Sequence, residues 1–156
     1  MPLPPADVRA PILKLAFASD NRARVNLHFG AATAFVVYEI GPDKAALSGF
    51  AEFPEETMDG NENKLAAKIE FLAGCDAVFV HAIGASAIRQ LLARGIQPIR
   101  VGQNDDIAGL LREIRAALRE DGAESRVPWI ARALAARAKA NAIDRFTLME
   151  SEGWEG

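Results

Sequence analysis

The sequence predicts a mixed α/β domain in which helices flank a five-stranded sheet. Three observations support this fold class. The first third of the chain carries short β-branched and aromatic runs separated by turn residues, which is typical of strands. After about residue 60, apolar residues recur at helical spacing and alternate with two further short apolar runs. The chain has 156 residues, 50% of them hydrophobic, which is enough for the core of one domain.

The first part of the predicted domain is an antiparallel meander. Residues 12–18 are apolar and bounded by polar residues, which indicates a buried strand. A polar loop over 19–26 follows, and further strands are expected over 34–40 and 46–53. The turn Gly41-Pro42-Asp43-Lys44 joins these last two strands. Because so short a connection suits antiparallel neighbours, the two strands form a hairpin.

The second part alternates helices with strands. Strands that are joined by a helical crossover run parallel, so the complete sheet is mixed. Pro98 cannot donate a ladder hydrogen bond, which predicts that the last strand lies at a sheet edge. The expected ranges are 61–73 (helix), 77–80 (strand), 85–94 (helix), 96–101 (strand) and 105–120 (helix).

Three segments make up the predicted domain organisation. Residues 1–11 contain four prolines and predict a disordered or extended arm. We expect residues 12–120 to form the α/β domain, which also holds every candidate site residue described below. Residues 121–156 are expected to lie beyond the core as a C-terminal helical tail. That tail has a helix over 127–142 and no clear structure from Phe146 onward.

Composition and missing motifs exclude several function classes. The net charge of −3 gives no reason to expect nucleic acid or an anionic membrane as a partner. No apolar run approaches the ~20 residues that a membrane span needs. The first residues lack a signal-peptide pattern, so we expect a cytoplasmic protein. The phosphate-binding loop, the nucleophile elbow and a cysteine–histidine–carboxylate trio are all absent, so we expect no enzyme activity.

Residues that could bind a metal are scarce. Cys75 is the only cysteine, and His28 and His81 are the only histidines. Four cysteine or histidine ligands, for zinc or for a conventional iron–sulfur cluster, therefore cannot come from one chain. A metal cluster carried here must arrive assembled and be held by few protein ligands.

The most specific local feature is His28-Phe29-Gly30, in the loop after the first strand. An exposed imidazole could bind a soft or borderline metal, and Gly30 would allow a tight turn or a close approach to a ligand. Arg22 and Arg24 precede the tripeptide and could offset the charge of an anion. On these residues alone, a surface histidine beside a packed phenylalanine is the favoured interpretation.

A second feature is the small-residue turn Gly84-Ala85-Ser86, which joins a buried strand to a helix. Its N–H groups and the helix dipole suit an anion, and a crevice tends to open there. An ordinary connection capped by Ser86 explains the same residues. His81 could point into the crevice or be a hydrogen-bonded core residue. Cys75 could bind metal, but a buried and inert thiol is the simpler interpretation.

Six segments, taken in order, carry a family resemblance. Together they resemble the nitrogenase iron–molybdenum cofactor biosynthesis family, and most closely its NifX branch, over residues 12–118. Each segment is weak alone, whereas the ordered set is specific. The segments are Leu13 to Ser19, His28 to Gly30, Asp59 to Leu65, Gly74 to Val78, Ile83 to Ala87 and Leu91 to Pro98.

The resemblance implies a ribonuclease H-like sheet without nuclease chemistry and transient binding of an iron–sulfur precursor of the nitrogenase cofactor. It implies a NifB-type cluster source and a NifEN-type scaffold as partners. It matches His28 to the family's candidate cluster ligand and the turn 84–86 to the family's small-residue loop. The alternative is a chaperone-like partner of apo-dinitrogenase, as NafY-type relatives are. A metal-dependent nuclease is disfavoured, because the strands lack the required acidic cluster.

Overall fold

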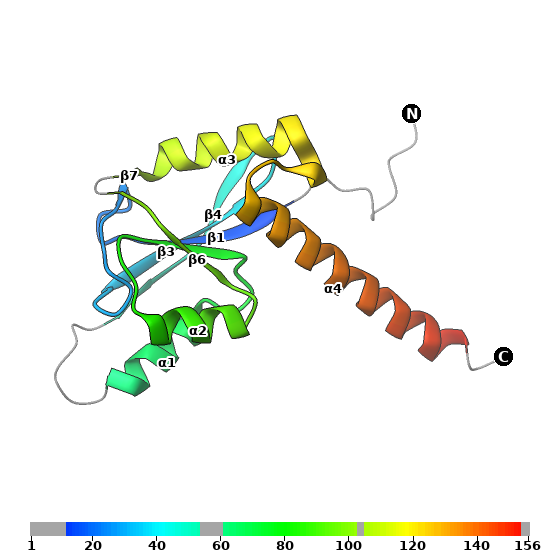
Figure 1. Cartoon of the computed structure of the whole chain (residues 1–156), viewed down its shortest axis with the longest axis horizontal. Helices are drawn as coiled ribbons and strands as arrows, with labels where there is room; N and C mark the ends of the chain where they lie inside the picture. The colour runs from blue at the N-terminus through cyan, green and yellow to red at the C-terminus, as the bar shows by residue number, and fades with distance from the viewer. Residues whose placement is uncertain (1–11, 54–60, 103–104, 154–156) are drawn as a thin grey trace.

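The structure, a computed structural model, describes residues 12–53, 61–102 and 105–153 (Figure 1). Seven strands, four α-helices and a short 3-10 helix are described in these ranges. In chain order they are β1 (Leu13–Ala18), β2 (Arg24–Val25), β3 (Ala34–Ile40), β4 (Ala45–Glu52), α1 (Asn61–Phe71), β5 (Ala77–Val80), α2 (Ala85–Ala93), β6 (Gln97–Arg100), β7 (Asp105–Asp106), α3 (Ile107–Asp121), η2 (Gly122–Glu124) and α4 (Pro128–Gly153).

The main sheet has five strands in the order β4-β3-β1-β5-β6. β1 lies in the middle and pairs antiparallel with β3, where Phe17 faces Val36. On its other side β1 pairs parallel with β5, where Phe17 faces Phe79. β6 forms one edge, so the predicted edge position of Pro98 is confirmed. The mixed five-stranded sheet and its antiparallel meander are confirmed as well.

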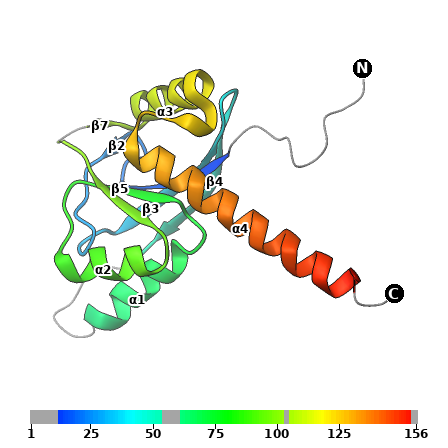
Figure 2. The same cartoon turned by 45° about the vertical axis from the view of Figure 1, so that its right-hand side comes forward.

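Each face of the sheet carries its own hydrophobic core. Along β1, Leu15 and Phe17 belong to the core that α3 and the start of α4 cover. Ala16 and Ala18 belong to the core on the opposite face, which α1 and α2 cover. This alternation follows from the two-residue period of a strand. Figure 2 shows the two helix pairs on opposite sides of the sheet.

The start of α4 corrects the expectation that residues 121–156 lie beyond the core. Ile130 and Leu134 are buried in the same core as Phe17. The Trp129 ring meets the Phe79 ring edge-on, with centroids 5.5 Å apart. α4 also continues to Gly153, well past the predicted end at residue 142. Its first turns therefore complete the sheet's cover, while its later turns project from the body (Figure 2).

Polar contacts fasten α4 to the amino ends of β5 and β6. Arg137 forms a salt bridge with Asp76, with Nη2 2.6 Å from Oδ2. The same carboxylate accepts a hydrogen bond of 2.8 Å from the Lys14 main-chain N–H. Gln97 donates to the Trp129 carbonyl at 2.8 Å. Residue 120 is therefore not a packing boundary.

A two-residue ribbon was missed in the sequence. β2 lies within the predicted loop 19–26 and pairs antiparallel with β7. β7 occupies the first two residues of the predicted helix 105–120, so that helix begins at Ile107 instead. The Asp106 carboxylate accepts a hydrogen bond from the Gly109 N–H at 3.1 Å, which is an N-cap contact.

Two further expectations concern the N-terminal arm and membrane-spanning helices. The predicted arm over residues 1–11 lies outside the described residues. Within the described ranges, no helix combines the length and the apolar character that crossing a membrane requires.

Candidate functional site

His28 and His81 lie side by side beyond the carboxyl ends of β1 and β5. The segments that carry them are joined by main-chain hydrogen bonds. The His81 N–H donates to the Leu27 carbonyl at 2.9 Å, and the Phe29 N–H donates to the Ala82 carbonyl at 2.8 Å. These bonds extend the parallel pairing by one bridge, between His28 and Ala82. The two ring centroids are 5.1 Å apart, with the rings tilted by 58°.

The two imidazoles differ in exposure. His28 is exposed, as predicted, whereas His81 is half-buried. Nδ1 of His81 is buried and has no hydrogen-bond partner in the part of the chain that the structure describes. Buried polar atoms without a partner are rare in native proteins, so this nitrogen is a candidate contact for a ligand.

Phe29 anchors the histidine loop in the core. Its side chain is fully buried and packs against the Phe35 ring at a centroid distance of 5.6 Å. Gly30 is exposed, and its backbone does not adopt a positive φ angle. A tight turn therefore does not require glycine here. The space beside Gly30 is open for at least 4 Å around an added Cβ, which leaves room for a ligand.

Lys68 supports the same loop from α1 and was missed in the sequence. Its side chain is only 1% exposed. Nζ donates to the Gly30 carbonyl at 2.6 Å and approaches the Phe29 carbonyl at 3.4 Å. Its position on the predicted helix could have indicated that it is buried, because Lys68 lies on the same apolar face as Leu65 and Leu72.

The turn 84–86 begins α2 directly after the His81 segment. Gly84 is the N-cap residue, and no side chain caps the helix. The interpretation of Ser86 as a cap is therefore wrong. Its hydroxyl instead accepts a hydrogen bond from Gln90 at 3.2 Å. Gly84, Ala85 and Ser86 are all exposed, so the first N–H groups of the helix are available to an anion.

The structure does not bring Arg22 to the histidine pair. The Arg22 guanidinium lies over the Phe50 ring, 4.0 Å from its centroid. Phe50 belongs to β4, three strands from β5, which corresponds to about 14 Å across the sheet. Arg24 lies in β2, where it pairs with Asp106. The predicted contribution of Arg22 to an anion site beside His28 is therefore not supported by its position.

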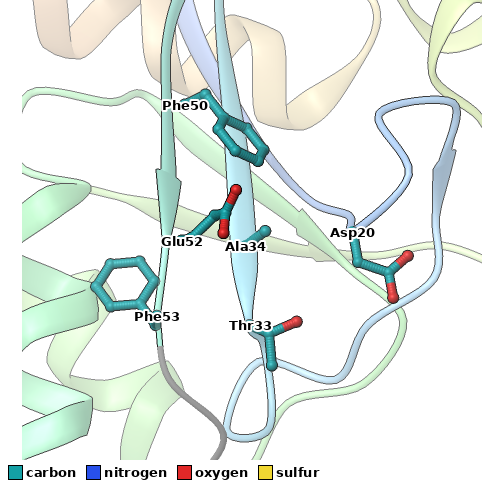
Figure 3. A pocket seen from close by; sticks show the side chains of 6 residues that line it. All are labelled: Asp20, Thr33, Ala34, Phe50, Glu52 and Phe53. Atoms are coloured by element: carbon teal, nitrogen blue, oxygen red, sulfur yellow. The ribbon is translucent and has the colours of Figure 1, made fainter.

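A hollow of about 320 Å³ lies at the β3–β4 edge (Figure 3). It is separate from the histidine pair, and two of its lining side chains are carboxylates. An anionic ligand would be repelled there. Its lining residues are Asp20, Thr33, Ala34, Phe50, Glu52 and Phe53.

Cys75 lies at the opposite end of β5 from His81. Asp76 and the four residues of β5 separate them, which corresponds to roughly 15–20 Å. Cys75 is buried, and this burial raises the pKa of its thiol to about 11. One site that contains both Cys75 and His28 is therefore excluded. Within the described ranges, no three or more histidine, cysteine or acidic side chains are grouped to hold a metal ion.

Comparisons with known proteins place the chain in a family. Residues 11–117 match the family described as dinitrogenase iron-molybdenum cofactor. The chain is 43% identical over 144 residues to the NifX protein of Azotobacter vinelandii, covering 92% of this chain and 88% of that protein. It is also 36% identical over 93 residues to the same organism's FeMo cofactor biosynthesis protein NifB, covering 56% of this chain and 18% of NifB.

A solved structure, that of PH0822, shares the fold with a TM-score of 0.52 and 22% identity. It covers 66% of this chain and 90% of PH0822. The family match extends from before β1 into α3 and includes the His28 loop and the turn 84–86. The chain therefore belongs to the dinitrogenase iron–molybdenum cofactor family.

Proposed function

We propose that this protein binds and carries, or stores, an iron–sulfur precursor of the nitrogenase cofactor. It acts in the cytoplasm, receives the precursor from a NifB-type source and passes it to a NifEN-type scaffold. It is a binding protein and not an enzyme. The observation that carries the proposal is the exposed His28 imidazole beside the uncapped start of α2.

The chemistry of the two groups is complementary to an anionic cluster. Imidazole is a suitable ligand for iron, and His28 is accessible to a cluster that approaches from solvent. The N–H groups at the start of α2 carry partial positive charge and favour the anionic sulfides. Because few protein ligands hold the cargo, few bonds must break when the cargo passes to another protein. This property suits a carrier better than a permanent holder.

The similarity to part of NifB supports the assignment of the cargo. The matched region covers 18% of NifB but 56% of this chain. The family description and the name of NifB both refer to the iron–molybdenum cofactor, which supports a cargo that belongs to that cofactor's biosynthesis. The direction of transfer, from source to scaffold, is part of the proposal.

The test is anaerobic transfer from a cluster-loaded NifB-type donor to His28→Ala and wild-type protein. After desalting, iron per chain is measured together with visible absorption. We expect the variant to retain at least about tenfold less cluster, because its most accessible ligand is gone. Arg22→Ala is the matched control, since Arg22 lies in the preceding loop but contacts Phe50 instead. Equal iron in His28→Ala and wild type would contradict the proposal.

The same preparation separates the carrier from the chaperone-like alternative. Metal-free protein is mixed with apo-dinitrogenase, and complex formation is followed by gel filtration. Binding to apo-dinitrogenase without any uptake of cluster from the donor would favour the chaperone-like role. Uptake and release of cluster in the absence of apo-dinitrogenase supports the carrier.

A further inference from the structure

We propose that His81 is a second metal-binding residue, and that His28 and His81 together chelate one borderline transition-metal ion. This inference deepens the proposed function, since the chelated ion would be an iron of the cargo. It adds a ligand that the sequence alone left open between a metal contact and a core residue.

The spacing of the rings fits one shared ion. With metal–nitrogen bonds of about 2.0–2.1 Å, a nitrogen-to-centroid distance of about 1.2 Å and a tetrahedral angle, two imidazoles on one ion have centroids about 5 Å apart. The observed separation is 5.1 Å. The rings are tilted by 58°, so they do not lie face to face. The centroid separation is therefore compatible with one nitrogen of each ring binding the same ion.

The main chain fixes this spacing independently of any ligand. The hydrogen bonds from His81 N–H to Leu27 and from Phe29 N–H to Ala82 hold the two segments in register. The buried Phe29 ring anchors one of them in the core. Because both histidines stand on segments held by the sheet, little ordering is needed when an ion binds.

The unpartnered nitrogen of His81 is the second, independent observation. Nδ1 is buried and accepts or donates no hydrogen bond within the described ranges. A buried imidazole nitrogen in a stable core ordinarily has a partner. A metal ion bound by either His81 nitrogen would fix the tautomer and the ring orientation of this side chain.

Two imidazoles leave coordination positions open. Since the described residues offer no cluster of three ligands, they leave the remaining positions on the ion open to other ligands. In the cargo these would be its own sulfides. On a bare ion they would be water. The site thus resembles open catalytic sites more than closed structural ones, and its affinity should be moderate.

The test uses Cu²⁺ alone, because copper heads the divalent affinity series and its EPR spectrum reports coordinated nitrogens. Full-length wild type, His28→Ala, His81→Ala and the double variant are titrated, with circular dichroism to verify folding. We expect wild type to bind one ion with coupling to two imidazole nitrogens. Each single variant should bind at least about tenfold more weakly, with one such coupling. The double variant measures copper bound elsewhere.

The outcomes separate this inference from the proposed function. Copper binding by His81→Ala that equals wild type in affinity and nitrogen coupling would overturn the chelate, even if His28→Ala still loses the cluster. Two-nitrogen copper binding without any cluster uptake from the donor would overturn the proposed function and leave the chelate intact. If His81→Ala does not fold, His81→Gln replaces it, since glutamine keeps a polar side chain but supplies no imidazole nitrogen.

Discussion

Lys68 shows how a single buried side chain can position the candidate site. Its ammonium donates to the Gly30 carbonyl, directly beneath the loop that carries His28. Replacing Lys68 by methionine keeps the apolar stem and removes this donor. We expect Lys68→Met to lower the free energy of unfolding by about 1–3 kcal/mol, because a partly buried carbonyl loses its partner.

The measurement for Lys68→Met is urea denaturation, combined with hydrogen exchange at the Phe29 amide. The variant should exchange this amide faster than wild type, because the loop opens more often. Lys44→Met is the matched control, since Lys44 is exposed in the β3–β4 turn. Wild-type stability and exchange in Lys68→Met would show that Lys68 does not hold the loop.

Cys75 should be a structural thiol with a clear pH signature. Burial raises the pKa of its thiol to about 11, with Asp76 adding to the rise and Lys14 and Arg137 opposing it. At pH 8 about one molecule in a thousand then carries the thiolate that reacts. We expect iodoacetamide to modify the folded protein far more slowly than the urea-unfolded protein.

The same pKa gives the sign of a stability effect. The folded thiol ionises at higher pH than the unfolded thiol, so its contribution is complete below about pH 8.5. That contribution is lost as pH rises from there toward 11. Denaturation midpoints of wild type should therefore fall more steeply over this range than those of Cys75→Ala. Cluster uptake by Cys75→Ala should match wild type, and its loss would instead identify Cys75 as a ligand.

The candidate residues differ in how far the sequence could predict them. The exposure of His28 follows from its place in a polar loop, and the scarcity of ligands follows from counting residues. The position of Arg22 could not be predicted, because its contact with Phe50 joins a loop to a strand that is three elements further along the chain. The approach of His81 to His28 likewise depends on parallel pairing between distant segments.

At the scale of elements, the period of the apolar residues was enough to predict the long helices and the five main strands. It failed for β2 and β7, which are two residues each and have no period. It also failed to show that α4 joins the core. Its described buried residues lie in the first turns, around Ile130 and Leu134, and most of the described side chains from 135 to 142 are exposed.

Two truncations test the role of α4. A chain that ends at Glu120 loses Ile130, Leu134 and the Trp129 contact with Phe79. Each large buried side chain contributes about 1.5–3 kcal/mol, against a total stability of about 5–15 kcal/mol. We expect this chain to be severely destabilised. A chain that ends at residue 142 keeps these contacts and the Arg137–Asp76 salt bridge, and should melt like the full chain.

Circular dichroism and thermal melting of the two truncated chains give the answer. The chain that ends at residue 142 is the matched control, since it also loses the end of the helix. A cooperative, near-wild-type melt of the chain that ends at Glu120 would show that the contacts of α4 add little.

At the scale of the whole molecule, the sheet order explains where the candidate site lies. β1 and β5 are parallel neighbours, so their carboxyl ends lie at the same edge of the sheet. A crevice is expected outside the carboxyl ends of such strands. The sequence predicts this position and leaves His81 open between the crevice and the core, whereas its approach to His28 required the structure. The ribonuclease H-like relationship stays a prediction.

The ligand supply of the whole chain leads to the last prediction. Supplied with free iron and sulfide, the protein should not assemble a stable cluster, because cubane assembly draws on several thiolates. This chain has one cysteine, and it is buried far from the histidines. A preformed cluster brings its own sulfides and needs only one or two imidazoles and oriented N–H groups.

Anaerobic reconstitution from inorganic iron and sulfide is compared with transfer from a loaded donor, each followed by desalting and iron analysis. Only the donor route should give about one cluster per chain, and chelation by a competing scaffold should remove it again. A stable, stoichiometric cluster on a monomer by the inorganic route would mean that scarce ligands do not limit this protein to carrying what others build.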